Sequence, residues 1–198
     1  VKGCQFVVFN FLAVVLPVET YGKFGLLYSY QSAIGTFATT GIGEITIGRL
    51  KNYTSTLEKR LLFQQSNGLF LITGGLSLLV FSMVGIISMR NENNSVLLSL
   101  VLAILLGLVL AYASLQGQFF RLEERYGMSI LTSTGVLFFS IFGIGLSGWI
   151  LQDILSIYFY GLGAACAGFA LLVATGNMYF SLPNFGELKK SLKELMPF

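Results

Sequence analysis

The feature that most limits the fold of this 198-residue chain is a series of long apolar runs separated by short charged segments. Each run approaches or exceeds the roughly 20 residues that a helix needs to cross the hydrocarbon core of a bilayer. Only 11% of the residues are charged, against about a quarter in soluble domains. With 55% hydrophobic residues and a mean hydropathy of +0.78, the chain has too few polar residues to cover a water-facing surface. We therefore predict an all-α, polytopic membrane helix bundle of about six transmembrane helices, at residues 1–16, 24–47, 62–89, 96–119, 128–149 and 154–182.

A transmembrane β-barrel does not fit these runs. Barrel strands alternate apolar and polar residues over about ten positions, whereas most of these runs are apolar on all sides for about twenty residues or more. Between the first two runs, Pro17, Glu19, Gly22 and Lys23 predict a polar turn. Before the third run, the segment 55–58 has the pattern of a capping box that opens a helix.

The connecting segments also predict an orientation. Short loops that are rich in Lys and Arg stay on the cytoplasmic side of a membrane. With six spans, Lys23 and Arg90 lie on one side, and ten basic residues lie on the other: Lys2, Arg49, Lys51, Lys59, Arg60, Arg121, Arg125, Lys189, Lys190 and Lys193. We therefore expect the side with ten basic residues, and both ends of the chain, to face the cytoplasm.

The predicted domain organisation is one six-helix bundle over residues 1–182, followed by a cytoplasmic linker at 183–198. The stretch 187–194 in this linker is basic and amphipathic, which is typical of a helix at the membrane interface. A new apolar segment starts at Leu195, so we expect the linker to lead into a seventh helix of a longer protein.

Several kinds of chemistry find no support in the sequence. There is no histidine, no glycine-rich phosphate loop and no pair of acids deep within a run. Cys4 and Cys166 lie in apolar segments without ligand spacing, so we interpret them as small hydrophobic residues. We predict a protein that is not an enzyme, with no catalytic residues, no metal and no cofactor. The net charge of +3 arises in the loops and does not predict a nucleic-acid partner.

Uncharged polar residues within the runs are the first candidates for a functional site. They include Gln31 in the second run, Gln116 and Gln118 at the end of the fourth, and Asn177 in the sixth. An amide in hydrocarbon is costly unless it is paired or hydrated, so these side chains should face other helices or a water-filled cavity. Two interpretations remain open: hydrogen bonds between helices, or the lining of a path for a polar cargo. Their spread over several helices favours the path.

Charged residues near the helix ends are the second group of candidates. Glu44 and Arg49 lie at the predicted cytoplasmic end of the second run, and Arg121 follows the two glutamines of the fourth. An interfacial arginine can extend to the lipid headgroups, or it can bind the phosphate of an anionic cargo. The predicted substrate path thus consists of Gln31, Glu44, Arg49, Gln116, Gln118, Arg121 and Asn177.

Small residues recur at helical spacing in the last two runs, where Gly143, Gly148, Gly161 and Gly168 are examples. Small residues allow membrane helices to approach each other closely. We therefore expect most of these residues to lie at close contacts between helices.

Several segments resemble the polysaccharide flippases, the O-antigen and repeat-unit exporters of the multidrug/oligosaccharidyl-lipid/polysaccharide superfamily. The stretch 16–22, with Pro17 followed by Tyr21 and Gly22, is similar to the turn between that family's first two helices. Residues 24–49, which end in Thr40-Gly41-Ile42-Gly43 and then Arg49, resemble its second helix. The loop 52–60, the connection 116–125 and the basic segment 189–194 are similar as well. Many relatives have an acidic residue just before the glycine of the second helix, where this chain has Thr39-Thr40, so a role for that acid does not carry over.

The resemblance implies one lobe of a two-lobe transporter in a bacterial or archaeal plasma membrane. It also implies a lipid-linked oligosaccharide as cargo, moved from the cytoplasmic to the outer leaflet, and a missing carboxy-terminal helix bundle of the same chain as partner. Two alternatives remain: a multidrug or metabolite exporter of the same superfamily, and a membrane scaffold without transport activity.

Overall fold

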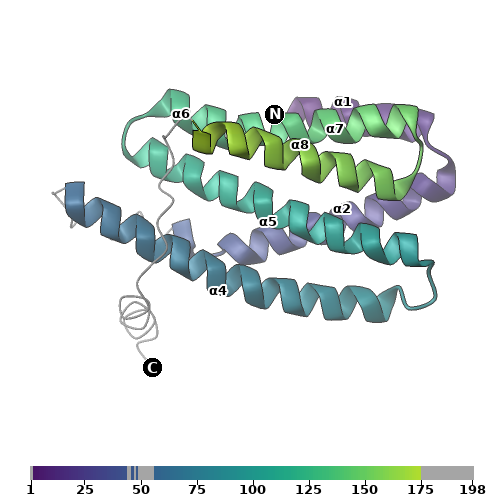
Figure 1. Ribbon diagram of the computed structural model, residues 1–198, viewed down its shortest axis with the longest axis horizontal. Helices are drawn as coiled ribbons and strands as arrows, with labels where there is room; N and C mark the ends of the chain where they lie inside the picture. Colours follow the sequence, from purple (N-terminus) through teal and green to yellow (C-terminus); the bar gives the residue numbers. More distant parts are fainter. Residues whose placement is uncertain (1, 44–45, 47, 49–55, 175–198) are drawn as a thin grey trace.

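We describe the fold from a computed structural model, in which residues 2–43, 46, 48 and 56–174 are placed well enough to describe. All the elements in this part of the chain are helices, which confirms the all-α prediction. Successive helical rods run in opposite directions and lie side by side (Figure 1). Four of the rods are single helices in chain order: α1 (Lys2–Val15), α2 (Val18–Thr39), α4 (Thr56–Ser88) and α5 (Asn94–Leu122). The next rod is continuous and consists of α6 (Tyr126–Ile130), the π-helical turn η1 (Leu131–Gly135) and α7 (Val136–Ile150). The last rod is α8 (Ile154–Ala174).

Four of the rods are long and apolar enough to cross a membrane: Glu58–Ser88, Asn94–Leu122, Tyr126–Ile150 and Ile154–Ala174. The apolar part of α1, Gln5–Val15, is shorter. Helix α2 has 22 residues and is about 33 Å long at 1.5 Å per residue, but it contains many Ser, Thr and Gln side chains. The polytopic bundle is thus confirmed, while membrane crossing by α1 and α2 stays a prediction.

Four helices, α2, α4, α5 and α6, begin before the predicted apolar runs. Helix α2 starts at Val18, directly after Pro17, so most of the predicted polar turn belongs to its first turns. Proline suits a helix start because its missing N–H would have no partner there. Within α2, Lys23 Nζ lies 2.8 Å from Glu19 Oε1. Helix α4 starts at Thr56 rather than at residue 62, and Ser55 of the predicted capping box is outside the described residues. Hydropathy marks the part of a helix that suits hydrocarbon, whereas backbone hydrogen bonds continue into the polar interface.

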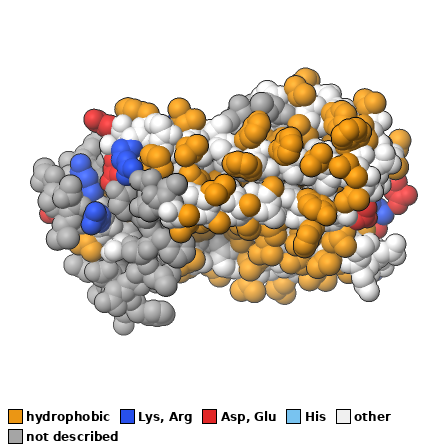
Figure 2. Space-filling view, turned by 45° about the horizontal axis from the view of Figure 1, so that its top comes forward, with side chains coloured by type: hydrophobic (Ala, Val, Ile, Leu, Met, Phe, Trp, Pro, Cys, Tyr) orange, Lys and Arg blue, Asp and Glu red, His pale blue; other side chains and the backbone are white. Residues whose placement is uncertain are grey.

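Helix α5 lies at the centre of the bundle. Leu100, Ala103, Ile104 and Leu106 on this helix are fully buried, and they pack with buried residues of α2, α7 and α8. The outer surface carries many exposed hydrophobic side chains between two charged ends (Figure 2). Such a broad apolar belt is the surface that a bilayer would cover.

Helices α7 and α8 pack as closely as the small residues predicted. A Cβ atom on Gly143 would lie 2.7 Å from the carbonyl oxygen of Tyr160. A Cβ atom on Gly161 would lie 2.7 Å from Ile144 Cγ1. Both positions therefore need glycine at the contact between these helices.

Candidate functional site: a polar pocket between α1, α2 and α5

A pocket with a polar lining lies between α1, α2 and α5 and has a volume of about 260 Å³. Helix α2 supplies most of its wall, with α1 contributing Gln5 and α5 contributing its middle turns. The polar side chains of the wall are uncharged amides and hydroxyls: Gln5, Tyr28, Gln31, Ser32, Thr36, Thr39 and Ser114. A polar pocket inside an otherwise apolar bundle is the first place to look for function.

Gln31 is the most unusual residue of this pocket. Buried residues of α2 recur every three or four positions and are otherwise apolar: Phe24, Leu27, Ile34 and Ala38. Gln31 occupies the middle of this stripe, with only 6% of its surface exposed. Its Oε1 atom is buried and has no hydrogen-bond partner among the described residues. A buried polar atom without a partner costs free energy. Gln116 Oε1, Ser129 Oγ and Ser140 Oγ are in the same situation among the described residues.

Two glycines bring α2 and α5 close together at this point. A Cβ atom on Gly107 would collide with the backbone carbonyl of Gln31 and would lie 2.7 Å from Ile34 Cγ2. A Cβ atom on Gly35 would lie 3.4 Å from the carbonyl oxygen of Gly107. This close approach fixes the backbone that carries Gln31, so the amide is positioned by rigid helices.

The threonines of the pocket act mainly as acceptors. Thr36 Oγ1 donates to the carbonyl oxygen of Ser32 at 3.0 Å, and Thr39 Oγ1 donates to that of Gly35 at 2.9 Å. Their hydroxyl hydrogens are thus engaged by the helix, while the oxygen lone pairs can accept hydrogen bonds. Tyr28 adds an aromatic wall, and its ring packs edge-to-face on Phe9 with the ring centroids 4.6 Å apart. The pocket therefore combines an aromatic ring with amide and hydroxyl groups that can donate as well as accept hydrogen bonds.

The predicted path residues do not all meet in this pocket. Gln31 lines it. Gln116 is fully buried between α5 and α4, where its Nε2 donates to Asn67 Oδ1 at 3.0 Å, so it makes a hydrogen bond between helices. Gln118 is half-buried and its side chain lies against Gly43, beyond the end of α2. Arg121 is exposed in the last turn of α5. Glu44, Arg49 and Asn177 lie outside the described residues.

Several pocket residues were absent from the predicted path, namely Gln5, Tyr28, Ser32, Thr36, Thr39 and Ser114. Their spacing holds a signal that could have found them. Tyr28, Gln31, Gly35 and Thr39 recur at three- and four-residue intervals, so they share one face of α2. Hydropathy alone hides such a face because it averages over all sides of the helix.

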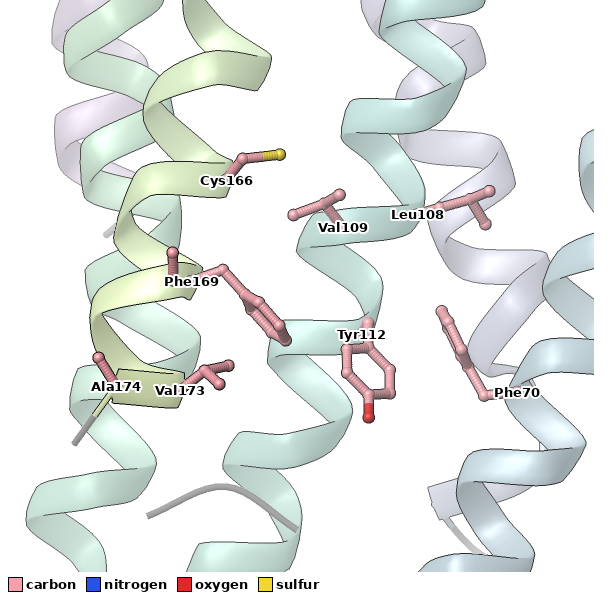
Figure 3. A pocket seen from close by; sticks show the side chains of 9 residues that line it. Phe70, Leu108, Val109, Tyr112, Cys166, Phe169, Val173 and Ala174 are labelled. Atoms are coloured by element: carbon pink, nitrogen blue, oxygen red, sulfur yellow. The ribbon is translucent and has the colours of Figure 1, made fainter. Parts of the chain in front are cut away.

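A second, larger pocket of about 660 Å³ lies between α4, α5 and α8 and is almost entirely apolar (Figure 3). The Tyr112 ring stands between Phe70 and Phe169, with ring centroids 5.2 Å and 5.6 Å away. Cys166 also lines this pocket. These side chains suit hydrocarbon, as on any lipid-facing surface, and the pocket is poorly suited to a polar cargo. The described residues also contain no group of three or more His, Cys, Asp or Glu side chains that could hold a metal ion.

An apolar bundle of antiparallel helices with a polar pocket in one face is typical of a multi-pass membrane protein. The sequence model of the family described as "Polysaccharide biosynthesis protein" matches residues 1–198, and the chain belongs to this family. Members of the family act as transporters or flippases rather than as enzymes. No curated protein and no solved structure matches the chain.

Proposed function

We propose that this protein moves a lipid-linked oligosaccharide from the cytoplasmic to the outer leaflet of a bacterial or archaeal plasma membrane. The observation that supports this most directly is the uncharged polar pocket between α1, α2 and α5, within a bundle of the polysaccharide biosynthesis family. Sugars cannot cross hydrocarbon unaided because their hydroxyl groups would lose their hydrogen bonds. A polar pocket lowers that cost, while the lipid tail stays in the bilayer beside the apolar outer surface.

The diphosphate that links lipid and sugar needs a separate site. The start of α4, with Lys59 and Arg60, and the end of α5, with Arg121 and Arg125 beyond it, lie at the same end of the bundle (Figure 1), which also carries the acids Glu58, Glu123 and Glu124. In this proposal that end faces the cytoplasm and attracts the anionic linkage as the cargo enters. Arginine favours such contacts because its planar fork matches phosphate oxygens.

Transport in this proposal requires a second helix bundle, which a further part of the same polypeptide would supply. Alternating access needs one bundle to rock against another around a central site. The described helices pack as one bundle around α5.

The alternatives predict a different pocket. An exporter of cationic drugs would be served by an acidic side chain facing its cargo, and the polar side chains of this pocket are all uncharged. A scaffold without transport would gain nothing from a pocket with polar walls between its helices.

Reconstitution tests the proposed function. The intact protein is placed in liposomes with a fluorescent polyprenyl diphosphate disaccharide in both leaflets, and a membrane-impermeant quencher is added outside. We expect nearly all of the fluorescence to become accessible, against about half in protein-free liposomes. Protection of the inner half despite inserted protein would contradict the proposal. Uptake of a fluorescent cationic dye by the same liposomes would favour the drug exporter instead.

A further inference from the structure

The apolar pocket between α4, α5 and α8 is poorly suited to a polar cargo, and its walls suit a different ligand. Its volume is about 660 Å³. Helix α5 contributes Leu108, Val109 and Tyr112, between Phe70 of α4 on one side and α8 on the other (Figure 3). The described lining contains no charged side chain, and its polar side-chain groups are only the Tyr112 hydroxyl and the Cys166 thiol. Such a lining favours a hydrocarbon ligand.

The pocket occupies one half of the length of the bundle. Leu108 is the middle residue of α5, and Cys166 lies just past the middle of α8. From Cys166 the lining continues to Ala174 at the end of α8, over about 12 Å at 1.5 Å per residue. Helix α5 runs in the same half toward Arg121 in its last turn. The pocket therefore extends from the middle of the bundle toward the end that faces the cytoplasm in the predicted orientation.

The pocket is continuous with the apolar outer surface of the bundle. Ala170 and Val173 of its lining are themselves exposed. Leu71, which follows Phe70 on α4, and Leu171, which follows Ala170 on α8, are exposed as well. This belt is the surface that a bilayer would cover, so a ligand enters the pocket from the bilayer. An empty pocket would lose the dispersion contacts that a hydrocarbon chain makes with its walls.

Aromatic rings give the pocket a fixed shape. The Tyr112 ring stands between Phe70 and Phe169, and these three rings come from α5, α4 and α8 respectively. Because such rings have few rotatable bonds, a ligand that enters orders few protein side chains, which lowers the entropic cost of binding. A chain in the pocket contacts three helices at once, whereas a chain on a flat part of the surface has protein on one side only.

We infer that this pocket binds one acyl chain of a phospholipid from the leaflet at the basic end of the bundle, and that the bound chain connects α4 to α8. The chain enters at Ala174, and its terminal carbons lie near Cys166. Phospholipid is the occupant because it forms the surrounding bilayer, and the occupancy of a site rises with the concentration of its ligand. This lipid site lies outside the polar pocket and goes beyond the proposed function.

Photo-cross-linking tests the site in liposomes that contain the intact protein. The probe is a phosphatidylcholine with a diazirine at the end of one acyl chain, and mass spectrometry identifies the cross-linked residues. Phe138 is the matched reference, because it is the middle residue of the α6–η1–α7 rod, is exposed and lines neither the polar nor the apolar pocket. Ala170→Phe fills the pocket from its exposed rim, and Ala13→Phe is the control at an exposed alanine of α1.

We expect the probe to mark Val109 and Tyr112 at least about four times as often as the more exposed Phe138, since burial of one further methylene favours binding by about that factor. Ala170→Phe should lower the cross-links at Val109 and Tyr112 to the level of Phe138, whereas Ala13→Phe should keep the wild-type pattern. In detergent, added phospholipid should raise the Tm of Ala170→Phe less than that of wild type, because the phenyl ring takes the place of the chain. The comparison within wild type stands without either variant.

Three outcomes would overturn the inference. Equal marking of the pocket and of Phe138 would show that only bulk lipid covers this face. Marking of Phe138 without any marking of the pocket would show that another part of the protein fills it. Loss of the pocket cross-links on addition of polyprenyl phosphate, but not of the same amount of unlabelled phospholipid, would assign the pocket to the tail of a carrier lipid. These measurements do not require transport, so the proposed function is tested separately by its own reconstitution.

Discussion

At the scale of single residues, two buried glutamines show how the same side chain meets different environments. Gln116 is fully buried, and its amide nitrogen donates to Asn67 on the neighbouring helix. Gln31 is nearly as buried and lines the polar pocket, and the Oε1 atoms of both glutamines are buried without a partner among the described residues. The difference lies in the Gln116 amide nitrogen, whose bond to Asn67 connects α5 to α4.

The bond between Gln116 and Asn67 predicts a measurable contribution to stability. We expect Gln116→Leu to lower the free energy of unfolding in detergent by about 1 kcal/mol, since hydrogen bonds between membrane helices contribute on that order. The pair of single variants and the double variant Asn67→Leu/Gln116→Leu form a cycle that isolates the interaction. A coupling energy of zero in this cycle would show that the bond is not stabilising.

Arg121 predicts an effect on transport rather than on stability. It is exposed in the last turn of α5, where its guanidinium can reach an anionic cargo or a headgroup. We expect Arg121→Gln to lower transport of the lipid-linked sugar at an unchanged membrane level. Arg121→Lys should recover only part of the loss, because lysine supplies charge without the bidentate fork.

The measurement for Arg121 is transport per unit of inserted protein. Full recovery by lysine would indicate that the residue only anchors α5 at the interface. Normal transport by Arg121→Gln would remove it from the path altogether. Arg49, which the sequence predicts for the same role, can be tested in parallel.

At the scale of helices, the sequence predicts the existence and order of the rods well, because long apolar runs have few other folds in a membrane. It places their ends less well. Helix α2 begins at Val18, six residues before the apolar run at residue 24. Helix α4 begins at Thr56, before the apolar run at residue 62 but within the segment 55–58 whose capping-box pattern predicts a helix start. Charged residues near a helix end remain helical in the interface, so hydropathy underestimates helix length. The π-helical turn at Leu131–Gly135 carries no hydropathy signal at all.

The candidate site was only partly predictable for a related reason. Gln31 stands out in sequence as an amide within an apolar run, and the structure places it in the pocket. The close approach of α2 and α5 at Gly107 depends on which helices are neighbours, and a single sequence does not give that pairing. The same pairing of helices decides that Gln31 lines a pocket, whereas Gln116 makes a hydrogen bond to a neighbouring helix.

Gly107 allows the contact between α2 and α5 to be tested directly. We expect Gly107→Ala to destabilise the protein by about 1–3 kcal/mol, because its Cβ would meet the Gln31 backbone, which cannot turn aside as a side chain would. Gly75→Ala on α4 is the matched control, since a Cβ there has nothing within 4 Å. Alanine should leave stability at Gly75 unchanged or slightly higher through its better helix propensity. Equal effects at the two glycines, measured by thermal unfolding in detergent, would contradict the close packing.

At the scale of the whole molecule, the two ends of the bundle differ in charge. The end with the α2 and α5 starts carries Lys23 and Arg90 together with the acids Glu19, Glu92 and Asp153. Lys23 Nζ lies 3.1 Å from Glu92 Oε2, which joins the start of α2 to the turn before α5. The opposite end carries four basic residues at the α4 start and the α5 end, Lys59, Arg60, Arg121 and Arg125, together with the acids Glu58, Glu123 and Glu124. This difference favours the predicted orientation, with the more basic end in the cytoplasm.

The orientation can be tested with single cysteines at the two ends of α5, in a background that lacks Cys4 and Cys166. Asn93 precedes this helix and Tyr126 follows it, and 29 residues of helix separate them by about 43 Å. We expect a membrane-impermeant maleimide to label Asn93→Cys in intact cells and Tyr126→Cys only after permeabilisation. Leu76→Cys, exposed on the apolar surface of α4, should resist labelling in both conditions because a thiol in hydrocarbon does not ionise. Labelling of Asn93→Cys and Tyr126→Cys from the same side would mean that α5 does not cross the membrane, and the predicted topology would be wrong.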